Sequence, residues 1–198
     1  MCIRDRVTVV GDLDADELAA IPTVKAMELH APAALGDSLA EVLGARVWKR
    51  SGIHLCERRG PAPVAEGPWA ELQVADYPRM RRFYSEQYPE TVLSPWMLEL
   101  PFAGVVEDGE IIACAGTMVA FEGAAHVGHF VTHPDHRGRG LASRVGAALI
   151  GLLAERGFDA VRLGVKDDNS VALRVYQGLG FEIMSTPTCL QARPGRPL

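Results

Sequence analysis

Hydrophobic positions along this 198-residue chain either alternate with polar ones or recur every three to four residues. Alternating and short apolar runs predict strands, and stripes at helical spacing predict helices. Before residue 59 the pattern predicts strands at 7–10, 25–29, 47–50 and 53–55, and helices at 14–21 and 35–43. Glycine and proline gather at 59–68, which predicts a linker between a small N-terminal α/β domain, 7–58, and a larger domain, 69–191.

The larger domain continues the alternation of strands and helices. The pattern predicts a strand at 72–74, helices at 77–88 and 91–100, and a hairpin with strands at 103–106 and 111–119. A strand at 124–132, a helix at 141–155 and strands at 161–165 and 181–184 follow. The tail, 192–198, carries two prolines and is expected to be frayed. The fold class that results is α/β.

The turn between the 124–132 strand and the 141–155 helix reads Arg137-Gly138-Arg139-Gly140-Leu141-Ala142. A helix start presents unpaired N–H groups at the positive end of the helix dipole, which suits an anion. The two arginines add positive charge, and the two glycines let the backbone approach a ligand closely. The turn therefore predicts a site for a phosphorylated small molecule.

Three phosphate-binding patterns compete for this turn. A P-loop requires Lys followed by Ser or Thr after its last glycine, and neither is present. A dinucleotide fingerprint requires a third small residue, a place that Ser143 fills poorly, and an acidic residue at a strand end, whereas Asp159 precedes its strand. The third pattern, Arg/Gln-x-x-Gly-x-Gly/Ala, is satisfied by Arg137, Gly140 and Ala142.

A second motif, N-S-V-A-L-R-V-Y-Q-G-L-G-F, occupies residues 169–181. Asn169 and Tyr176 are seven residues apart and project from one helix face. In this order the two motifs resemble the GNAT superfamily of N-acetyltransferases over roughly residues 70–190, although Arg174 and Val175 separate Leu173 from the tyrosine. The whole layout is loosely similar to bacterial glycine N-acyltransferase-like proteins with an N-terminal α/β domain. The resemblance implies a mixed, mostly antiparallel sheet with a splayed central strand, flanked by helices.

The resemblance also implies acetyl-CoA as co-substrate, with no metal. It places the pantetheine along the 130–132 strand end, where a backbone N–H can act as an oxyanion donor. Asn169 would bond the pantetheine or order the site, and Tyr176 would protonate the departing thiolate, since tyrosine is neutral near pH 7. The implied cofactor-binding residues are Phe130, Val131, Thr132, Arg137, Gly138, Arg139, Gly140, Leu141, Ala142, Asn169 and Tyr176.

The group that takes the proton from the amine stays open among His126, His129 and Glu122, with a water chain as the alternative. We choose His129, because the ordinary pKa of an imidazole, near 6.5, suits proton transfer at neutral pH. The early helices are expected to border the acceptor through Tyr84, Glu86 and Trp96.

The composition of the chain excludes some classes of partner and some locations. A net charge of −5 argues against nucleic acid, which is usually bound by a broad basic face. The four cysteines lack metal-ligand spacing, and no apolar run approaches a membrane span, so we expect a cytoplasmic protein with reduced thiols. Residues 1–6, Met-Cys-Ile-Arg-Asp-Arg, match the translation of a transposon-end sequencing adapter, and we expect them to replace part of the natural N-terminus.

These observations predict an enzyme that transfers an acetyl group from acetyl-CoA to a primary amine of a small molecule or amino-acid-like acceptor. Transfer would occur by direct attack in a ternary complex, because no Gly-x-Ser-x-Gly nucleophile elbow is present. The main alternative is a non-catalytic acyl-CoA-binding sensor or partner-binding module, and a nucleotide-dependent oxidoreductase is a weaker one. A homodimer is left open.

Overall fold

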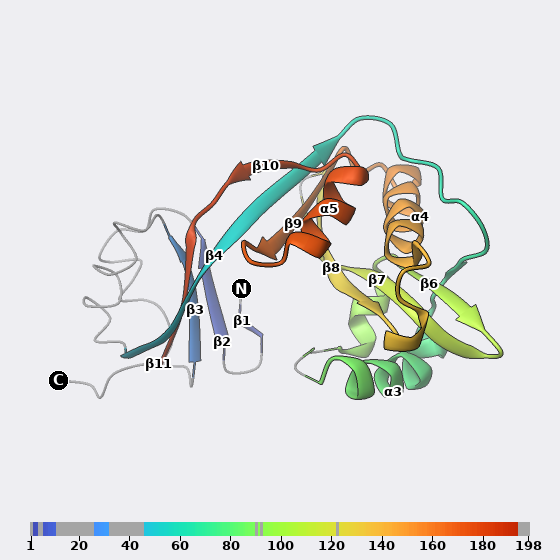
Figure 1. Ribbon diagram of the computed structural model, residues 1–198, viewed down its shortest axis with the longest axis horizontal. Coiled ribbons are helices and arrows are strands. Elements are labelled where there is room, and N and C mark those ends of the chain that lie inside the picture. The colour runs from blue at the N-terminus through green and yellow to red at the C-terminus, as the bar shows by residue number, and fades with distance from the viewer. Residues whose placement is uncertain are drawn as a thin grey trace. The chain divides into compact units, whose positions relative to one another are not determined.

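The computed structural model describes residues 2–3, 6–10, 26–31, 46–89, 91, 93–121 and 123–193 (Figure 1). The chain divides into two compact units, of which unit 1 comprises 1–55, 165–170 and 183–198, and unit 2 comprises 56–164 and 171–182. The predicted linker at 59–68 lies wholly within unit 2. The helices predicted at 14–21 and 35–43, together with Glu122 and residues 194–198, fall outside the described residues.

The described part of unit 1 is built on strands. These are β1 (Cys2–Ile3), β2 (Arg6–Val10), β3 (Ala26–Ala31), β11 (Thr188–Arg193) and the first part of β4 (Arg46–Arg59). β2 runs parallel to β3, and β11 pairs antiparallel with both β3 and β4. The predicted break at Ser51-Gly52 is wrong, because β4 is continuous there. The tail was expected to be frayed from Ala192, but β11 extends to Arg193.

Unit 2 is organised around a mixed sheet. Its further strands are β5 (Ala70–Glu71), β6 (Phe102–Glu107), β7 (Glu110–Phe121), β8 (Ala124–Thr132) and most of β9 (Ala160–Lys166), whereas β10 (Glu182–Ser185) belongs to unit 1 except for Glu182. The strand order is β4-β9-β8-β7-β6-β5, with β10 paired to β4. β5 to β8 are antiparallel neighbours, whereas β8 and β9 are parallel. The predicted mixed, mostly antiparallel sheet is confirmed.

The helices are η1 (Val74–Asp76), α3 (Tyr77–Gln87), η2 (Pro95–Glu99), η3 (Pro134–His136), α4 (Leu141–Glu155) and α5 (Ser170–Gly178). The helices predicted at 77–88 and 141–155 are confirmed. The prediction of a helix over 91–100 is wrong, because only the short 3-10 turn η2 forms there. Ser94 and Leu100 are both extended, as residues before Pro95 and Pro101 prefer to be. The strand predicted at 72–74 is also displaced, because β5 ends at Glu71 and η1 begins at Val74.

Two layers of helix cover the sheet of unit 2 (Figure 1). Helix α3 and η2 pack on one face, around a buried cluster that includes Met80, Tyr84, Phe102 and Cys114. Helix α4 packs on β6, β7 and β8, and its apolar stripe, which includes Val145 and Leu149, is buried. None of the helices in the described ranges has the length and apolar character needed to cross a bilayer.

Candidate functional site

The central strand β8 loses its partner β9 after the first third of its length. The parallel pairing covers only Ala124, Ala125 and His126, which face 160–162 of β9. Val127 is still buried, whereas every residue from Gly128 to Thr132 is half-buried. The partial exposure therefore begins almost where the pairing with β9 stops. The splayed central strand predicted from the sequence is confirmed, and Phe130, Val131 and Thr132 lie on its open part.

A β-bulge interrupts the other edge of β8 at the same place. Cys114 of β7 faces Val131, and Gly116 faces Gly128, so that Ala115 alone stands opposite His129 and Phe130. His129 has a φ of 57°, in the left-handed region that non-glycine residues rarely adopt. A bulge of this kind leaves one residue outside the ladder and turns its peptide groups.

The bulge is fixed from the α3 face by a buried tyrosine. The Tyr84 hydroxyl donates a hydrogen bond of 2.6 Å to the carbonyl oxygen of His129. The Tyr84 side chain is only 2% exposed, and desolvation raises the pKa of its phenol well above 10, so that it remains a donor. Sequence reasoning placed Tyr84 at the acceptor pocket and missed this bond, because only the fold brings α3 against β8.

The imidazole of His129 points to the same face as Tyr84. Its ring centroid lies 5.5 Å from that of Tyr84 and 5.6 Å from that of Phe102. Its Nε2 is buried and has no hydrogen-bond partner among the described residues. Burial lowers the pKa of His129 to about 4, so the ring is neutral at pH 7. A neutral ring can accept a proton, but at this pKa it does not retain one, and the role of base stays a prediction.

The predicted phosphate turn leads directly into α4. Gly138 and Gly140 have φ values of 76° and 73°, which glycine adopts without strain. Gly140 is the N-cap residue of α4, and the first helical bond runs from the Arg144 N–H to its carbonyl, at 3.1 Å. The N–H groups of the first turn, which begins with Leu141 and Ala142, are therefore available to an anion. A Cβ atom at either glycine would meet nothing within 4 Å, so the space beside the turn is open.

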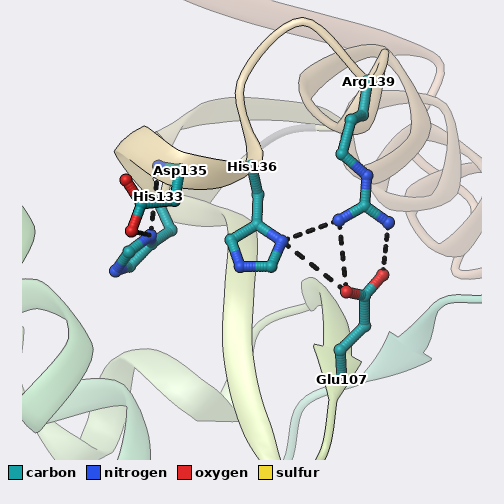
Figure 2. Close-up of polar contacts among 5 residues, drawn as sticks. All are labelled: Glu107, His133, Asp135, His136 and Arg139. Carbon is teal, nitrogen blue, oxygen red and sulfur yellow. Dashed lines mark hydrogen bonds and ion pairs between the residues drawn. The ribbon is translucent and has the colours of Figure 1, made fainter.

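The two arginines of the turn differ in their partners, and Figure 2 shows those of Arg139. Arg139 binds the carboxylate of Glu107 through both terminal nitrogens, at 3.1 and 2.6 Å, and its Nη1 lies 2.7 Å from His136 Nδ1. Because a guanidinium only donates, His136 Nδ1 is the acceptor. Arg137 forms no ion pair in the described part of the chain, and its Nε donates to the Thr132 carbonyl at 3.4 Å. Arg137 therefore offers its charge to an anion, whereas Arg139 is neutralised by Glu107.

Tyr176 reaches the open part of β8 from α5. Its ring lies 5.0 Å, centroid to centroid, from Phe130 in an edge-to-face arrangement, and 6.1 Å from Phe181. Burial raises the pKa of Tyr176 to about 12. The phenol is therefore neutral at all physiological pH values and can donate a proton. Asn169, which belongs to unit 1, directly precedes α5, and its N–H donates to the Lys166 carbonyl at 3.0 Å.

The remaining candidates lie at different places. His126 sits where the pairing of β8 with β9 ends, opposite Arg162. Trp96 is 56% exposed on η2. Glu86 lines a hollow of about 450 Å³ between α3 and η3, together with side chains that include His133 and His136. Within the described ranges no three acidic, histidine or cysteine side chains are grouped as metal ligands.

Comparison with known proteins identifies the family to which this arrangement corresponds. The model of the acetyltransferase (GNAT) family matches residues 68–181. The L-amino acid N-acyltransferase MnaT of Escherichia coli is 31% identical over 94 residues, which are 46% of this chain and 55% of that protein. A mycothiol acetyltransferase of Kytococcus sedentarius is 34% identical over 113 residues, 54% of this chain and 38% of the relative. The chain thus spans about half, or less, of the length of these curated relatives.

Solved structures give the same answer for the fold. A GNAT-family structure from Novosphingobium aromaticivorans superposes with a TM-score of 0.72 and 26% identity, covering 91% of this chain and 79% of that one. A GCN5-related N-acetyltransferase-like protein from Streptococcus suis superposes with a TM-score of 0.68 over 94% of this chain and 78% of that one, at 17% identity. The second match bears on the fold alone.

Proposed function

This chain belongs to the acetyltransferase (GNAT) family and is an enzyme, and we propose that it transfers an acetyl group from acetyl-CoA to a primary amine. The observation that carries the proposal is the position of the splay. The pairing of β8 with β9 ends at His126, and the same strand leads within a few residues to the glycine turn at the start of α4. An accessible strand edge for the pantetheine and an anion site for the diphosphate thus follow one another along the chain.

In this proposal the glycine turn holds the diphosphate. Gly138, Gly140 and the first N–H groups of α4 provide backbone donors, and Arg137 adds the charge that is not neutralised by a carboxylate within the described ranges. Phe130, Val131 and Thr132 supply the strand edge for the pantetheine. The reaction itself is an attack of the amine nitrogen on the thioester carbon, after which the C–S bond breaks and the acetyl group remains on nitrogen.

Tyr176 is our choice for the group that protonates the thiolate of coenzyme A. Its ring contacts Phe130, beside the expected path of the thioester, and its raised pKa of about 12 keeps it protonated. A free thiol has a pKa near 8.5, so the departing thiolate needs a proton donor most below that pH. A neutral proton donor at this position is what acetyl transfer requires and what an acyl-CoA sensor does not.

The amine must lose a proton during the transfer. We propose that this proton passes through water to the solvent, with the neutral His129 ring as a candidate acceptor on the way. Because the pKa of His129 is about 4, the ring would relay the proton and would not store it. Asn169 completes the proposed set as a residue that orders the start of α5 or bonds the pantetheine.

The acceptor is proposed to be a small amine of amino-acid type, in a cytoplasmic reaction that involves neither nucleic acid nor a membrane. Support comes from the E. coli relative, whose name gives L-amino acids as its substrates and which aligns over 46% of this chain. A homodimer stays part of the hypothesis.

Two-substrate kinetics tests the proposal. Initial rates measured over a grid of acetyl-CoA and L-amino acid concentrations should give intersecting reciprocal plots, and mass spectrometry should find the product heavier by one acetyl group. Tight binding of acetyl-CoA with no acetylated product from any amine would favour the sensor. Parallel plots would instead indicate a covalent acetyl-enzyme and would contradict direct attack.

A further inference from the structure

A hollow of about 450 Å³ opens between α3, the start of β7 and η3. The buried side chains of Phe83, Ile111 and Ile112 line it and form an apolar floor. Charged and polar side chains surround this floor, namely those of Arg82, Glu86, Glu110, His133 and His136. An apolar floor with a few polar groups around it is typical of a site for a small molecule.

Hydrogen bonds fix the tautomers of the two histidines in the hollow. Nδ1 of His136 accepts from Arg139 Nη1 at 2.7 Å (Figure 2). Nδ1 of His133 accepts from the Asp135 N–H at 3.3 Å. The carboxylates of Glu107 and Asp135 lie 3.6 and 3.9 Å from these Nδ1 atoms, too far for a hydrogen bond. An Nδ1 that accepts carries no proton, so each neutral ring has its proton on Nε2.

The Nε2–H groups of both rings are available to a ligand. Among the described residues, no hydrogen bond engages the Nε2 of His133 or of His136. Both rings line the same hollow, and their centroids are 5.4 Å apart. A nitrogen that keeps its proton is not a metal ligand. Two neighbouring N–H donors instead suit the two oxygens of a carboxylate.

Helix α3 supplies the charges of the hollow. Arg82 and Glu86 are four residues apart, so both side chains project from the same part of the helix. Nη2 of Arg82 donates to both carboxylate oxygens of Glu110, one of them at 2.6 Å, so these two charges are matched. Glu86 is exposed and forms no ion pair or hydrogen bond with another described residue. The hollow therefore has one unmatched carboxylate beside two N–H donors.

We propose that this hollow binds a free α-amino acid with an aliphatic side chain, at a second site that is separate from the proposed acetyl transfer and does not depend on it. The carboxylate accepts from the Nε2–H groups of His133 and His136, and the ammonium group pairs with Glu86. The aliphatic side chain lies on the apolar floor. An anion without an amine would leave Glu86 unmatched, and an amine without a carboxylate would leave both N–H donors without a partner.

The amino acid in the hollow is not the acceptor of the acetyl group. His133 follows the end of β8 and lies four residues beyond His129, a span of roughly 13 Å in extended chain. A single carbon joins the carboxylate of an α-amino acid to its ammonium group. An amino acid anchored at His133 therefore cannot bring its nitrogen to the thioester expected beside Phe130.

Arg139 is the positioning residue of this second site. It does not line the hollow, and it acts only through His136, whose Nδ1 it occupies. Arg139→Met cannot donate to Nδ1, so the proton of the His136 ring is no longer confined to Nε2. The affinity for the amino acid should fall about threefold, the effect of one hydrogen bond. Because Arg139 also belongs to the glycine turn, the hollow and the proposed phosphate site share this residue.

Nitrogen-15 NMR of histidine-labelled protein tests the tautomers and the site together. The sequence has six histidines, so each ring is assigned with its His→Asn variant. In the free protein, His133 and His136 should each show an unprotonated Nδ1 and a protonated Nε2. L-Leucine, added without an acyl donor, should shift the Nε2–H signals of these two rings until they saturate. Shifts confined to His129, which lies at the proposed reaction centre, or no shift of any ring, would overturn the second site.

Matched variants and ligands test the charges, with the same two signals as the readout. Glu86→Gln should weaken L-leucine binding about tenfold, because it removes a charge-assisted contact to the ammonium group. Glu155→Gln is the control, since Glu155 is exposed at the end of α4 and does not line the hollow. We also expect about tenfold weaker binding of 4-methylpentanoate, which lacks the amino group, and of L-leucine methyl ester, which lacks the carboxylate. Equal affinity for 4-methylpentanoate and L-leucine would refute an amino-acid site.

Discussion

Glu107 binds Arg139 through two parallel hydrogen bonds, of 3.1 and 2.6 Å, and thereby ties the end of β6 to the glycine turn (Figure 2). The same interaction lowers the pKa of the Glu107 carboxyl group, so the carboxylate is charged throughout the neutral range. The guanidinium that stands between Gly138 and Gly140 is thus already paired with an anion. Its contribution to phosphate binding should be smaller than its position in the motif indicates.

The first prediction follows from this pairing. Arg137→Gln should weaken coenzyme A binding about tenfold, because it removes a charge-assisted contact to the diphosphate. Arg139→Gln should weaken it by less than about threefold, because this charge is already matched by Glu107. Isothermal titration calorimetry at one salt concentration measures the coenzyme A affinity of both variants. An affinity that falls more in Arg139→Gln than in Arg137→Gln would contradict the assignment. In a Glu107→Gln background the effect of Arg139→Gln should become larger.

The second prediction concerns the turn itself. Gly140→Asp should abolish detectable acetyl-CoA binding, because it places a carboxylate at the anion site and a side chain on a backbone with a φ of 73°. Gly157→Asp provides the control, since Gly157 has a φ of 82°, follows the opposite end of α4 and has equally open surroundings. Both variants should lose some thermal stability, but only Gly140→Asp should lose the ligand. Unchanged binding in Gly140→Asp would refute the phosphate turn.

The third prediction concerns Tyr176. Tyr176→Phe should retain acetyl-CoA binding and lower kcat about a hundredfold or more, since a hundredfold is the lower end of the range for a lost general acid. Because the pKa of Tyr176 is about 12, its protonated form predominates below that value. The parent enzyme should therefore keep its kcat up to about pH 10, without a decline from deprotonation of the acid. Full activity of Tyr176→Phe, measured by thiol release at saturating substrates, would remove the tyrosine from the mechanism.

The fourth prediction concerns the stability of the fold as the pH falls. Burial lowers the pKa of His129 to about 4, whereas in the unfolded chain it lies near 6.5. Between these values the unfolded chain binds the proton that the folded one excludes, so the stability present above pH 6.5 is lost progressively toward pH 4. His129→Asn removes this titration and retains a residue that tolerates a positive φ. Melting temperatures between pH 7.5 and 4.5 should fall more steeply for the parent. If the melting temperatures of the parent and of His129→Asn fall in parallel with pH, the His129 ring is exposed to solvent and the prediction is wrong.

The sequence predicts an element correctly where the signals for it lie within that element or next to it. The apolar stripe of α4 and the glycines before it predicted a helix from Leu141 to Glu155, which is where the structure has it. The hairpin of β6 and β7 was signalled in the same way by its Asp108-Gly109 turn. A local effect of two prolines also explains why the helix predicted over 91–100 is wrong. Pro101, together with Pro95, holds the residues before them extended, and the predicted helix there shrinks to η2.

The parts of the site that the sequence did not predict depend on distant pairs. Tyr84 and His129 are 45 residues apart, and Glu107 and Arg139 are 32 residues apart. No local pattern marks a bulge at His129 either, because it arises from the register between β7 and β8. The low pKa of His129 has the same origin, since it comes from burial of the imidazole, against which the rings of Tyr84 and Phe102 pack only in the folded chain.

The most direct test of the central claim is the release of free thiol from acetyl-CoA in the presence of single amines. The panel should contain L-amino acids, polyamines, aminoglycosides and peptide N-termini, with Tyr176→Phe and Gly140→Asp assayed beside the parent. We predict amine-dependent thiol release with at least one class, strongest for amino-acid-like acceptors and lost or greatly reduced in both variants. Release that does not depend on the amine, or no release with any amine while acetyl-CoA still binds, would contradict N-acetyl transfer.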